Sequence, residues 1–262
     1  MSEPPPLPAD VRQVLIRSSL DASDEPCLVH WAPHDGVAPL LVGLHTWSCD
    51  RFNQVEQMLP GCRQRGWGLI LPEFRGPNRS TNPRAPQAGG SRLARQDIVD
   101  AVDWAVAAGR ADARWVFLLG GSGGGHMALL MAACAPRRFA AISAWVPITD
   151  LAAWHGQNPG YAEHVAACCG GPPGASPQVD AEYRQRSPLS HLEAMRDANL
   201  AVHHGRFDRS VPYSHTWRLA QGLEAIGAGR FYFEIFDGGH ELRYERAFAW
   251  FDAQLAAPRV RP

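Results

Sequence analysis

An excess of charge of one sign is what this sequence most clearly lacks. Its 262 residues hold 25 Lys and Arg against 26 Asp and Glu, so the formal net charge is −1 and the pI is about 6.8. Proteins that bind nucleic acids or anionic membranes concentrate basic residues on the contacting surface. The near balance gives no electrostatic case for either partner, and we expect neither nucleic acid nor a membrane to bind.

Targeting and membrane-spanning segments are also missing from the printed sequence. No apolar run is long enough to span a bilayer. The first residues, MSEPPPLPAD, lack the basic region followed by an apolar region that marks a secretory signal. We therefore expect a cytoplasmic protein in which prolines keep residues 1–10 extended and flexible.

The cysteines do not form the pattern of a metal site. None of them belongs to a C-x-x-C pair with a second ligand pair downstream, as a structural zinc site would require. We therefore expect no metal. Cytosolic thiols are normally reduced, so two free thiols in a loop are favoured over a strained disulfide between the neighbouring Cys168 and Cys169.

The sequence does contain a regular alternation of apolar runs and helical patterns, which is typical of βα units on a mostly parallel sheet. The expected strands cover residues 11–19, 26–33, 39–45, 67–74, 114–120, 139–147, 199–205 and 230–236, the first two as antiparallel edge strands. The expected helices cover residues 53–65, 91–109, 124–135, 215–228 and 246–256. Pro60 must bend or end the first of them. Together they predict a single domain over residues 1–262, with helices flanking a central sheet.

Residues 148–195 follow the sixth expected strand and break this alternation. They mix helix-compatible pieces with Gly- and Pro-rich loops, and the segment is long for a connection. We expect a lid-like insertion that shapes a pocket. Its polar side chains lack the apolar surface that the lid of an interfacial lipase needs.

Five glycines surround one serine in VFLLGGSGGGHMALL, residues 116–130. Gly120 to Gly124 fit G-x-S-x-G, the turn that exposes the nucleophile of α/β-hydrolases between a strand and a helix. Ser122 would occupy a strained backbone conformation, and the Gly123 amide at the helix N-terminus would stabilise an oxyanion. A dinucleotide loop is disfavoured because the next strand offers no acidic ribose ligand. We therefore predict the α/β-hydrolase fold, with the insertion after its sixth strand.

A nucleophilic serine needs a base that is itself oriented by an acid. In this fold the order along the chain is serine, acid, histidine. Asp208 follows the seventh expected strand and His240 follows the eighth, and the carboxyl ends of parallel strands meet in one crevice. We predict Asp208 as the acid and His240 as the base, with Asp150 as the alternative acid.

Other titratable residues near these positions have simpler interpretations. Asp237 lies close to His240 in the sequence, but such a neighbour more often caps a turn. His203 and His204 are expected to pack or to form hydrogen bonds. His126, just beyond the elbow, is expected to be structural.

The second oxyanion donor is expected from GLHTWSCD, residues 43–50, which follow the third expected strand. The backbone amide of Trp47 is the favoured donor and that of Thr46 the alternative. His45 would then stiffen the loop.

Four segments together, LLVGLHTWS, GGSGGGH, HGRFDRSVP and GGH, resemble the catalytic domain of the prolyl oligopeptidase-like family and the acetyl xylan esterases. The resemblance spans residues 39–262. It implies that His45 to Trp47 supply the oxyanion donor and that Asp208 is the acid, although Thr46 stands where the family has glycine. We expect no β-propeller of the kind that large members carry before this domain, since only about forty residues precede the third expected strand. Glu73 and Arg75 either contact substrate or form an internal ion pair.

Three functions remain open. The leading hypothesis is a serine carboxylic-ester hydrolase that acts through an acyl-enzyme on small-molecule short-acyl esters, a carbohydrate deacetylase included. This hydrolase would need no cofactor. Its pocket is predicted to include Thr46, Trp145, Trp154, Glu73 and Arg75. The tryptophans are chosen because aromatic walls suit sugar rings. The alternatives are a small peptidase or amidase and a non-catalytic binding module. The sequence leaves the oligomeric state open, a homo-oligomer included.

Overall fold

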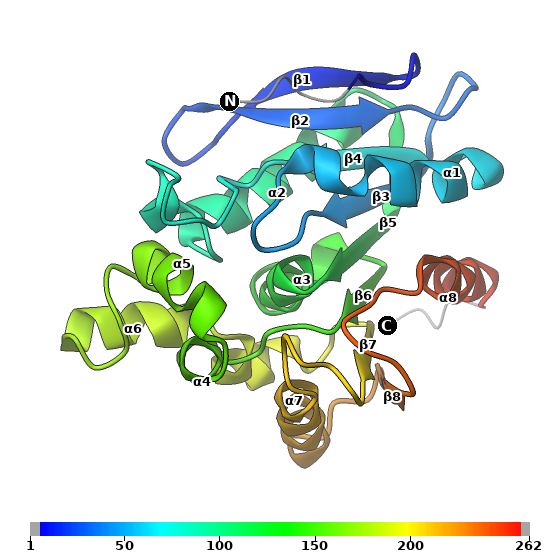
Figure 1. The fold of residues 1–262 in the computed structure, drawn as a ribbon. Helices are drawn as coiled ribbons and strands as arrows, with labels where there is room; N and C mark the ends of the chain where they lie inside the picture. The colour runs from blue at the N-terminus through cyan, green and yellow to red at the C-terminus, as the bar shows by residue number, and fades with distance from the viewer. Residues whose placement is uncertain (1–5, 258–262) are drawn as a thin grey trace.

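Eight strands form one sheet in the computed structural model, which describes residues 6–257 (Figure 1). Their order is β1-β2-β4-β3-β5-β6-β7-β8. The strands are β1 (Val11–Arg17), β2 (Asp24–His30), β3 (Ala38–Leu44), β4 (Gly68–Pro72), β5 (Ala111–Gly121), β6 (Ala141–Trp145), β7 (Leu200–Gly205) and β8 (Phe231–Phe236). β2 pairs antiparallel with β1 and β4, and the other neighbours pair in parallel. The predicted α/β-hydrolase fold is confirmed.

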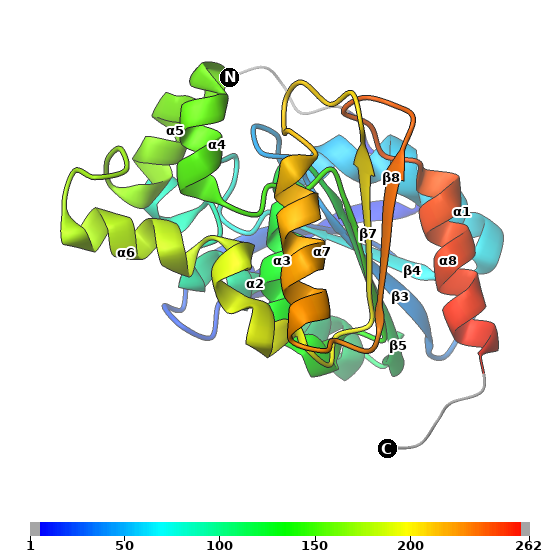
Figure 2. The same ribbon diagram turned by 90° about the horizontal axis from the view of Figure 1, so that it is seen from below.

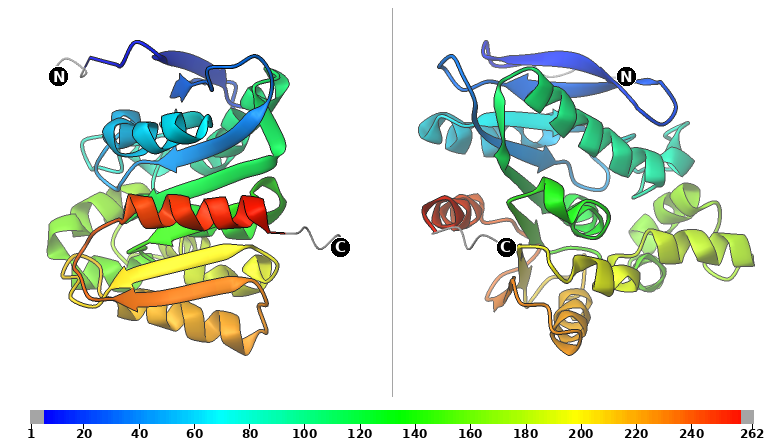
Figure 3. Two further views of the ribbon diagram at one scale, coloured as in Figure 1. Left: turned by 90° about the vertical axis from the view of Figure 1, so that its right-hand side faces the viewer. Right: turned by 180° about the vertical axis from the view of Figure 1, so that it is seen from behind.

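The central strands are continuous apolar runs because both of their faces are covered. Every residue of β4, β6 and β7 is buried. One face packs on α2 (Arg92–Ala107), α3 (Gly123–Cys134) and α7 (Ser214–Ala225), and the other on α1 (Val55–Arg65) and α8 (Tyr244–Ala256) (Figure 3). Apolar residues on both faces of a strand are therefore removed from water.

The first helix does not end at Pro60. α1 runs through it to Arg65 and stops at Gly66, whose φ of 64° suits a left-handed C-cap. Proline lacks the amide that would donate to the carbonyl of Glu56. Both residues lie on the exposed side of the helix. Water can replace the missing donor there.

The predicted insertion after β6 is helical. It consists of α4 (Leu151–Gln157), α5 (Pro159–Cys169), α6 (Pro177–Gln185) and a 3-10 segment, η4 (Pro188–Met195). α4, α5 and α6 lie beyond the α3 and α7 side of the sheet, away from α1 and α8 (Figure 2). Arg186 fixes the insertion to the loop before α2, because its guanidinium donates to the carbonyls of Ala88 (2.7 Å) and Pro86 (3.0 Å). Its action as a lid stays a prediction.

The two predictions made for local disorder and for thiols have different outcomes. Residues 1–5 of the expected flexible segment lie outside the described residues. Asp10, at its end, is held in place by Arg63 Nε at 2.9 Å and His30 Nδ1 at 3.0 Å. Cys168 and Cys169 are free, as predicted, but they are buried at the end of α5 instead of lying in a loop. Burial raises the pKa of both thiols to about 12.

Within residues 6–257, no helix is both long and apolar enough to cross a bilayer.

Candidate active site

Ser122 stands at the junction of β5 and α3, in a backbone conformation that few non-glycine residues adopt. Its φ is 56° and its ψ is −119°, and it forms the N-cap of α3. The Ser122 amide donates to the carbonyl of Trp145 at 2.9 Å. A Cβ at Gly120 would lie 2.2 Å from the carbonyl oxygen of Gly124, so no larger residue fits this turn. The predicted strand, sharp turn and helix are all present.

The backbones of Gly123 and Trp47 lie against each other. A Cβ added at Gly123 would come within 2.5 Å of the Trp47 nitrogen, so a side chain there would displace the Trp47 backbone. The Thr46 amide, by contrast, already donates to Oδ1 of Asn53 at 3.1 Å. Neither Gly123 nor Trp47 donates to an acceptor within residues 6–257. Their geometry suits a pair of oxyanion donors beside Ser122.

Asp208 is held as a buried carboxylate. Its side chain is fully buried, and its Oδ1 accepts from the amides of Ser210 (2.8 Å) and Val211 (2.9 Å). Oδ2 lies 2.7 Å from Nδ1 of His240. Burial acts to raise the pKa of Asp208, but hydrogen bonds from His204, His240 and Val211 outweigh it and hold the pKa well below its ordinary value.

His204 touches the acid, which the sequence did not reveal. Its Nε2 faces Oδ2 of Asp208 at 3.2 Å and the carbonyl of Val211 at 2.8 Å. Because both partners are acceptors, Nε2 carries the proton, and the Thr216 hydroxyl donates to Nδ1. The expectation that His204 forms hydrogen bonds is right, and the i, i+4 spacing from Asp208 was the available signal.

The loop that carries His240 fits tightly against the elbow. A Cβ at Gly121, next to Ser122, would lie 2.0 Å from the side chain of Leu242. The end of β7 is equally close, since a Cβ at Gly205 would lie 2.1 Å from the carbonyl of Gly239. The His240 side chain is 29% exposed, whereas that of Asp208 is fully buried. Nδ1 donates to Asp208, which leaves Nε2 as the nitrogen with a free lone pair.

The alternative acids and histidines are occupied elsewhere. Asp150 caps α4 by accepting from the Ala153 amide at 3.0 Å, and it pairs with Arg218. Asp237 pairs with Arg206 at the surface. His126 is buried, and burial lowers its pKa to about 4, so this histidine is neutral and structural as expected.

His203 also packs, as expected. Its ring stacks on Trp145 with centroids 4.0 Å apart, and its Nδ1 lies 2.9 Å from Glu234.

The predicted aromatic pocket walls are wrong. Trp145 and Trp154 are fully buried, and Trp47 is 1% exposed. The indole of Trp145 donates to Ser143, and that of Trp154 donates to the carbonyl of Ser210. The helices of the insertion close over Trp47 and Trp154, whose rings pack edge to face at 5.1 Å. These side chains are core and offer no surface to a substrate, although the Trp47 backbone amide stays beside Ser122.

The prediction that Arg75 contacts the substrate is also wrong. The alternative, an internal ion pair, is right, but Arg75 and Glu73 pair with other residues and not with each other. Arg75 is 1% exposed and donates to Asp97 at 2.6 Å and Asp21 at 2.7 Å. Glu73, which is 9% exposed, accepts from Arg51 at 2.8 Å. The two residues therefore fix the loop after β4 separately. Thr46 is half-buried, and its contact with substrate stays a prediction.

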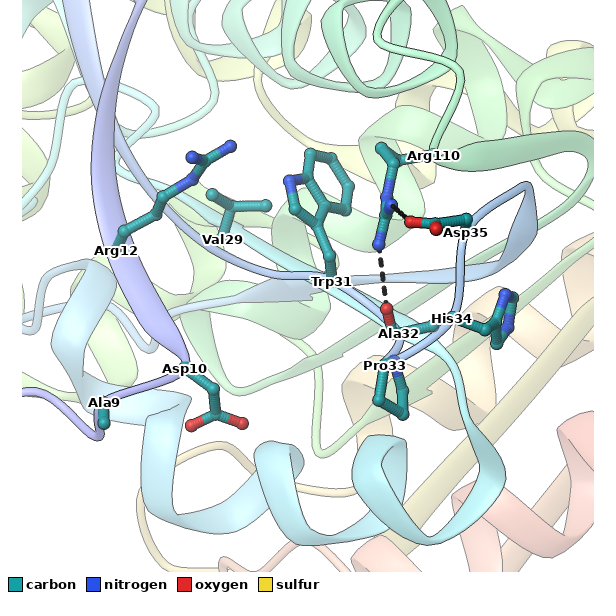
Figure 4. A pocket seen from close by; sticks show the side chains of 10 residues that line it. All are labelled: Ala9, Asp10, Arg12, Val29, Trp31, Ala32, Pro33, His34, Asp35 and Arg110. Atoms are coloured by element: carbon teal, nitrogen blue, oxygen red, sulfur yellow. Dashed lines mark hydrogen bonds and ion pairs between the residues drawn. The ribbon is translucent and has the colours of Figure 1, made fainter.

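Two hollows of about 400 Å³ lie away from Ser122. Figure 4 shows one, in which Trp31 lies between Arg12 and Arg110. Arg110 immediately precedes β5, so this hollow is at the opposite end of that strand from the elbow. The other is lined by Asp150, Tyr183 and Arg218, among others, behind the insertion. Neither includes Ser122 or His240.

Comparison with known proteins decides the family. A model described as the prolyl oligopeptidase family matches residues 90–257, well over half of the chain. The chain belongs to the prolyl oligopeptidase family. That family and the elbow make it a serine hydrolase with an α/β-hydrolase fold.

Curated proteins with similar sequences include acylamino-acid-releasing enzymes. One from Arabidopsis thaliana is 26% identical over 208 residues, which are 73% of this chain and 25% of the relative. A second, from Oryza sativa subsp. japonica, is 27% identical over 194 residues, 71% of this chain and 24% of the relative. The chain thus spans about a quarter of the length of these family members.

Solved structures share the fold. A puromycin-hydrolyzing peptidase from Mycobacterium tuberculosis has a TM-score of 0.71 at 20% identity, and the match covers 94% of this chain and 38% of that one. The acylaminoacyl peptidase of Pyrococcus horikoshii has a TM-score of 0.73 at 17% identity, with 96% and 43% covered.

Proposed function

We propose that this protein is a serine peptidase or amidase that hydrolyses small acylated substrates through an acyl-enzyme on Ser122. The observation that carries the proposal is the 2.7 Å contact between His240 Nδ1 and buried Asp208, on a loop that packs against the residue next to Ser122. A histidine oriented in this way, with its Nε2 within hydrogen-bond reach of Ser122 Oγ, would turn a weak hydroxyl into a nucleophile.

Each residue has a defined role in the reaction. Ser122 Oγ attacks the acyl carbonyl while His240 Nε2 takes its proton. The amides of Gly123 and Trp47 stabilise the negative charge on the carbonyl oxygen. His240 then gives the proton to the leaving group, and Asp208 stabilises the imidazolium in both steps. Water repeats the sequence on the acyl-enzyme and releases the acid.

The choice of an amide substrate over an ester follows from the relatives. Their names describe enzymes that release acylamino acids and hydrolyse puromycin, and both names imply attack on an amide or peptide bond. This favours the peptidase alternative over the carboxylesterase that the sequence first suggested. Amides and esters share every step except leaving-group protonation, which matters more for an amine. Activated short esters should therefore also react.

A matched pair of substrate panels tests this function. N-acetyl amino-acid p-nitroanilides and p-nitrophenyl esters from acetyl to octanoyl are compared by kcat/KM, with Ser122→Ala as the control for background hydrolysis. We expect hydrolysis of at least one anilide that depends on Ser122, together with activity on acetyl to butyryl esters that falls steeply by octanoyl. Ester hydrolysis with every anilide inert would restore the carboxylesterase hypothesis.

A further inference from the structure

Gln54 is a buried amide side chain outside the residues assigned so far to the reaction. It is 2% exposed and lies at the end of η1 (Arg51–Gln54), the short 3-10 helix that follows the oxyanion loop. A buried amide must hydrogen-bond at both ends, or it destabilises the fold by the cost of its desolvation. Both ends of Gln54 are satisfied, and their partners follow different loops of the site: Asn53 lies in η1 after the oxyanion loop, and Tyr244 begins α8 after the His240 loop.

The hydrogen bonds form a continuous chain. The Tyr244 hydroxyl donates to Gln54 Oε1 at 2.7 Å, and Gln54 Nε2 donates to Asn53 Oδ1 at 2.9 Å. The same Asn53 oxygen accepts the Thr46 amide at 3.1 Å. We call Asn53, Gln54 and Tyr244 the cross-loop chain. It connects segments 190 residues apart in the sequence, Gln54 beside the oxyanion loop and Tyr244 at the start of α8.

Both ends of the cross-loop chain lie next to residues that the reaction uses. Thr46 precedes Trp47, the proposed oxyanion donor. Tyr244 lies four residues after His240 in the sequence. Leu242, between them, packs on Gly121 of the elbow. The general base and the oxyanion donor come from β8 and β3, which are far apart in the sheet order. A direct link between their loops therefore adds a second constraint to the one that the intervening strands β5, β6 and β7 provide.

We propose that Asn53, Gln54 and Tyr244 are positioning residues, which hold the Trp47 amide and the His240 ring in register on either side of Ser122. This inference rests on the proposed function. By engaging the Thr46 amide, Asn53 also leaves the next amide, that of Trp47, as the free donor. The link acts on geometry that the transition state needs and the bound substrate does not, so its loss lowers kcat and leaves KM nearly unchanged.

Tyr244→Phe tests the cross-loop chain because it removes one hydroxyl and keeps the packed ring. The matched control is Tyr232→Phe, the same deletion on the exposed edge strand β8. The measurements are the rate at which a fluorophosphonate labels Ser122 and the hydrogen exchange of the segment that contains the Thr46 amide. We expect Tyr244→Phe to slow labelling about five-fold, the scale of one lost hydrogen bond, and to speed exchange at Thr46. Tyr232→Phe should change neither.

A double-mutant cycle then asks whether the three side chains act together. Asn53→Ala alone should slow labelling by about ten-fold, and Tyr244→Phe should add little to it, because the chain is already broken. Independent, multiplying effects, or a Tyr244→Phe variant equal to its control in both measurements, would overturn the inference. A wild-type protein that the probe does not label at Ser122 would instead overturn the proposed function, while the exchange at Thr46 would still decide whether the chain holds the loop.

Discussion

The acid loop after β7 and the oxyanion loop after β3 approach Ser122 from two sides, and the fold holds them by different means. Asp208 is fully buried and receives hydrogen bonds from two amides and two histidines. The oxyanion loop is held through its neighbours instead. Exposed Asn53 accepts the Thr46 amide, and buried His45, within the loop, places its Nε2 2.8 Å from the carbonyl of Glu73. A fixed charge is positioned by burying it among donors. A backbone amide that must stay free for substrate can only be positioned through its neighbours.

Removal of Ser122 should have the largest effect, since both loops act through it. Ser122→Ala should lower kcat by on the order of a million-fold, by comparison with a well-studied serine protease. The fold should be retained, because alanine fits the same turn. Labelling by a fluorophosphonate, followed by mass spectrometry, checks the assignment. Labelling that persists at another serine would show that Ser122 is not the nucleophile on which the two loops act.

The acid side should come next. Asp208→Asn should lower kcat by about ten-thousand-fold, because the amide favours the wrong tautomer of His240. Asp150→Asn is the matched control, since that residue caps α4 and pairs with Arg218. Steady-state rates of the two variants settle the matter. A larger loss at Asp150 would move the acid to the other loop.

His204 sharpens the comparison through pH. The pKa of Asp208 lies below the value of about 3.9 that an unfolded aspartate has, so its stabilising contribution is complete above that value and is lost as the pH falls through the folded pKa. His204→Ala removes one donor and raises that pKa. We expect the loss of stability in acid to be smaller than in the wild type and to level off at a higher pH, because the folded pKa lies closer to the unfolded one. We also expect kcat/KM at neutral pH to fall by about ten-fold.

Melting temperatures measured from pH 7 to pH 2 give the comparison directly. Thr216→Val is the control, because it removes the hydrogen bond on the far side of His204 and leaves the contact with Asp208. Parallel curves for wild type and His204→Ala would mean that His204 packs against the acid without stabilising its charge.

The smallest expected effect lies on the oxyanion side. Thr46→Gly restores the residue usual in the resembling families, and the amide that Asn53 holds is still present. Glycine is more flexible, so we expect kcat to fall by only about two- to five-fold, with KM unchanged. Steady-state kinetics on one acetyl ester suffice. A loss as large as that of Asp208→Asn would mean that the Thr46 side chain itself contacts the substrate.

The sequence predicted what depends on local chemistry. All eight strands overlap the expected segments, although β2, β3 and β5 begin one to three residues earlier, and chain order with strand ends placed Asp208 and His240 together. The elbow could also be predicted from the sequence, because glycines between a strand and a helix have few other roles.

What failed depends on packing between distant segments. The prediction that Trp145 and Trp154 line a crevice missed two separate packing arrangements. Trp145 lies in the core on the α1 and α8 face of the sheet and stacks on His203, and the helices of the insertion bury Trp154. Arg75 looked available for substrate because its carboxylate partners come from the β1–β2 hairpin and from α2. Tyr244 gave no signal at all, since its partner is 190 residues away. The hydrophobic periodicity of a sequence carries no information about contacts between such distant residues.

The small core under the insertion has a consequence for exchanging parts between relatives. Trp47, from the oxyanion loop, and Val211, three residues after Asp208, share one buried cluster with Leu151 and Trp154 of α4. A transplanted insertion of different shape would therefore leave a void or a clash under both loops at once. Exchanging the insertion alone would therefore not transfer substrate preference from one relative to another. The insertion and the two loops must be inherited, or redesigned, as one unit.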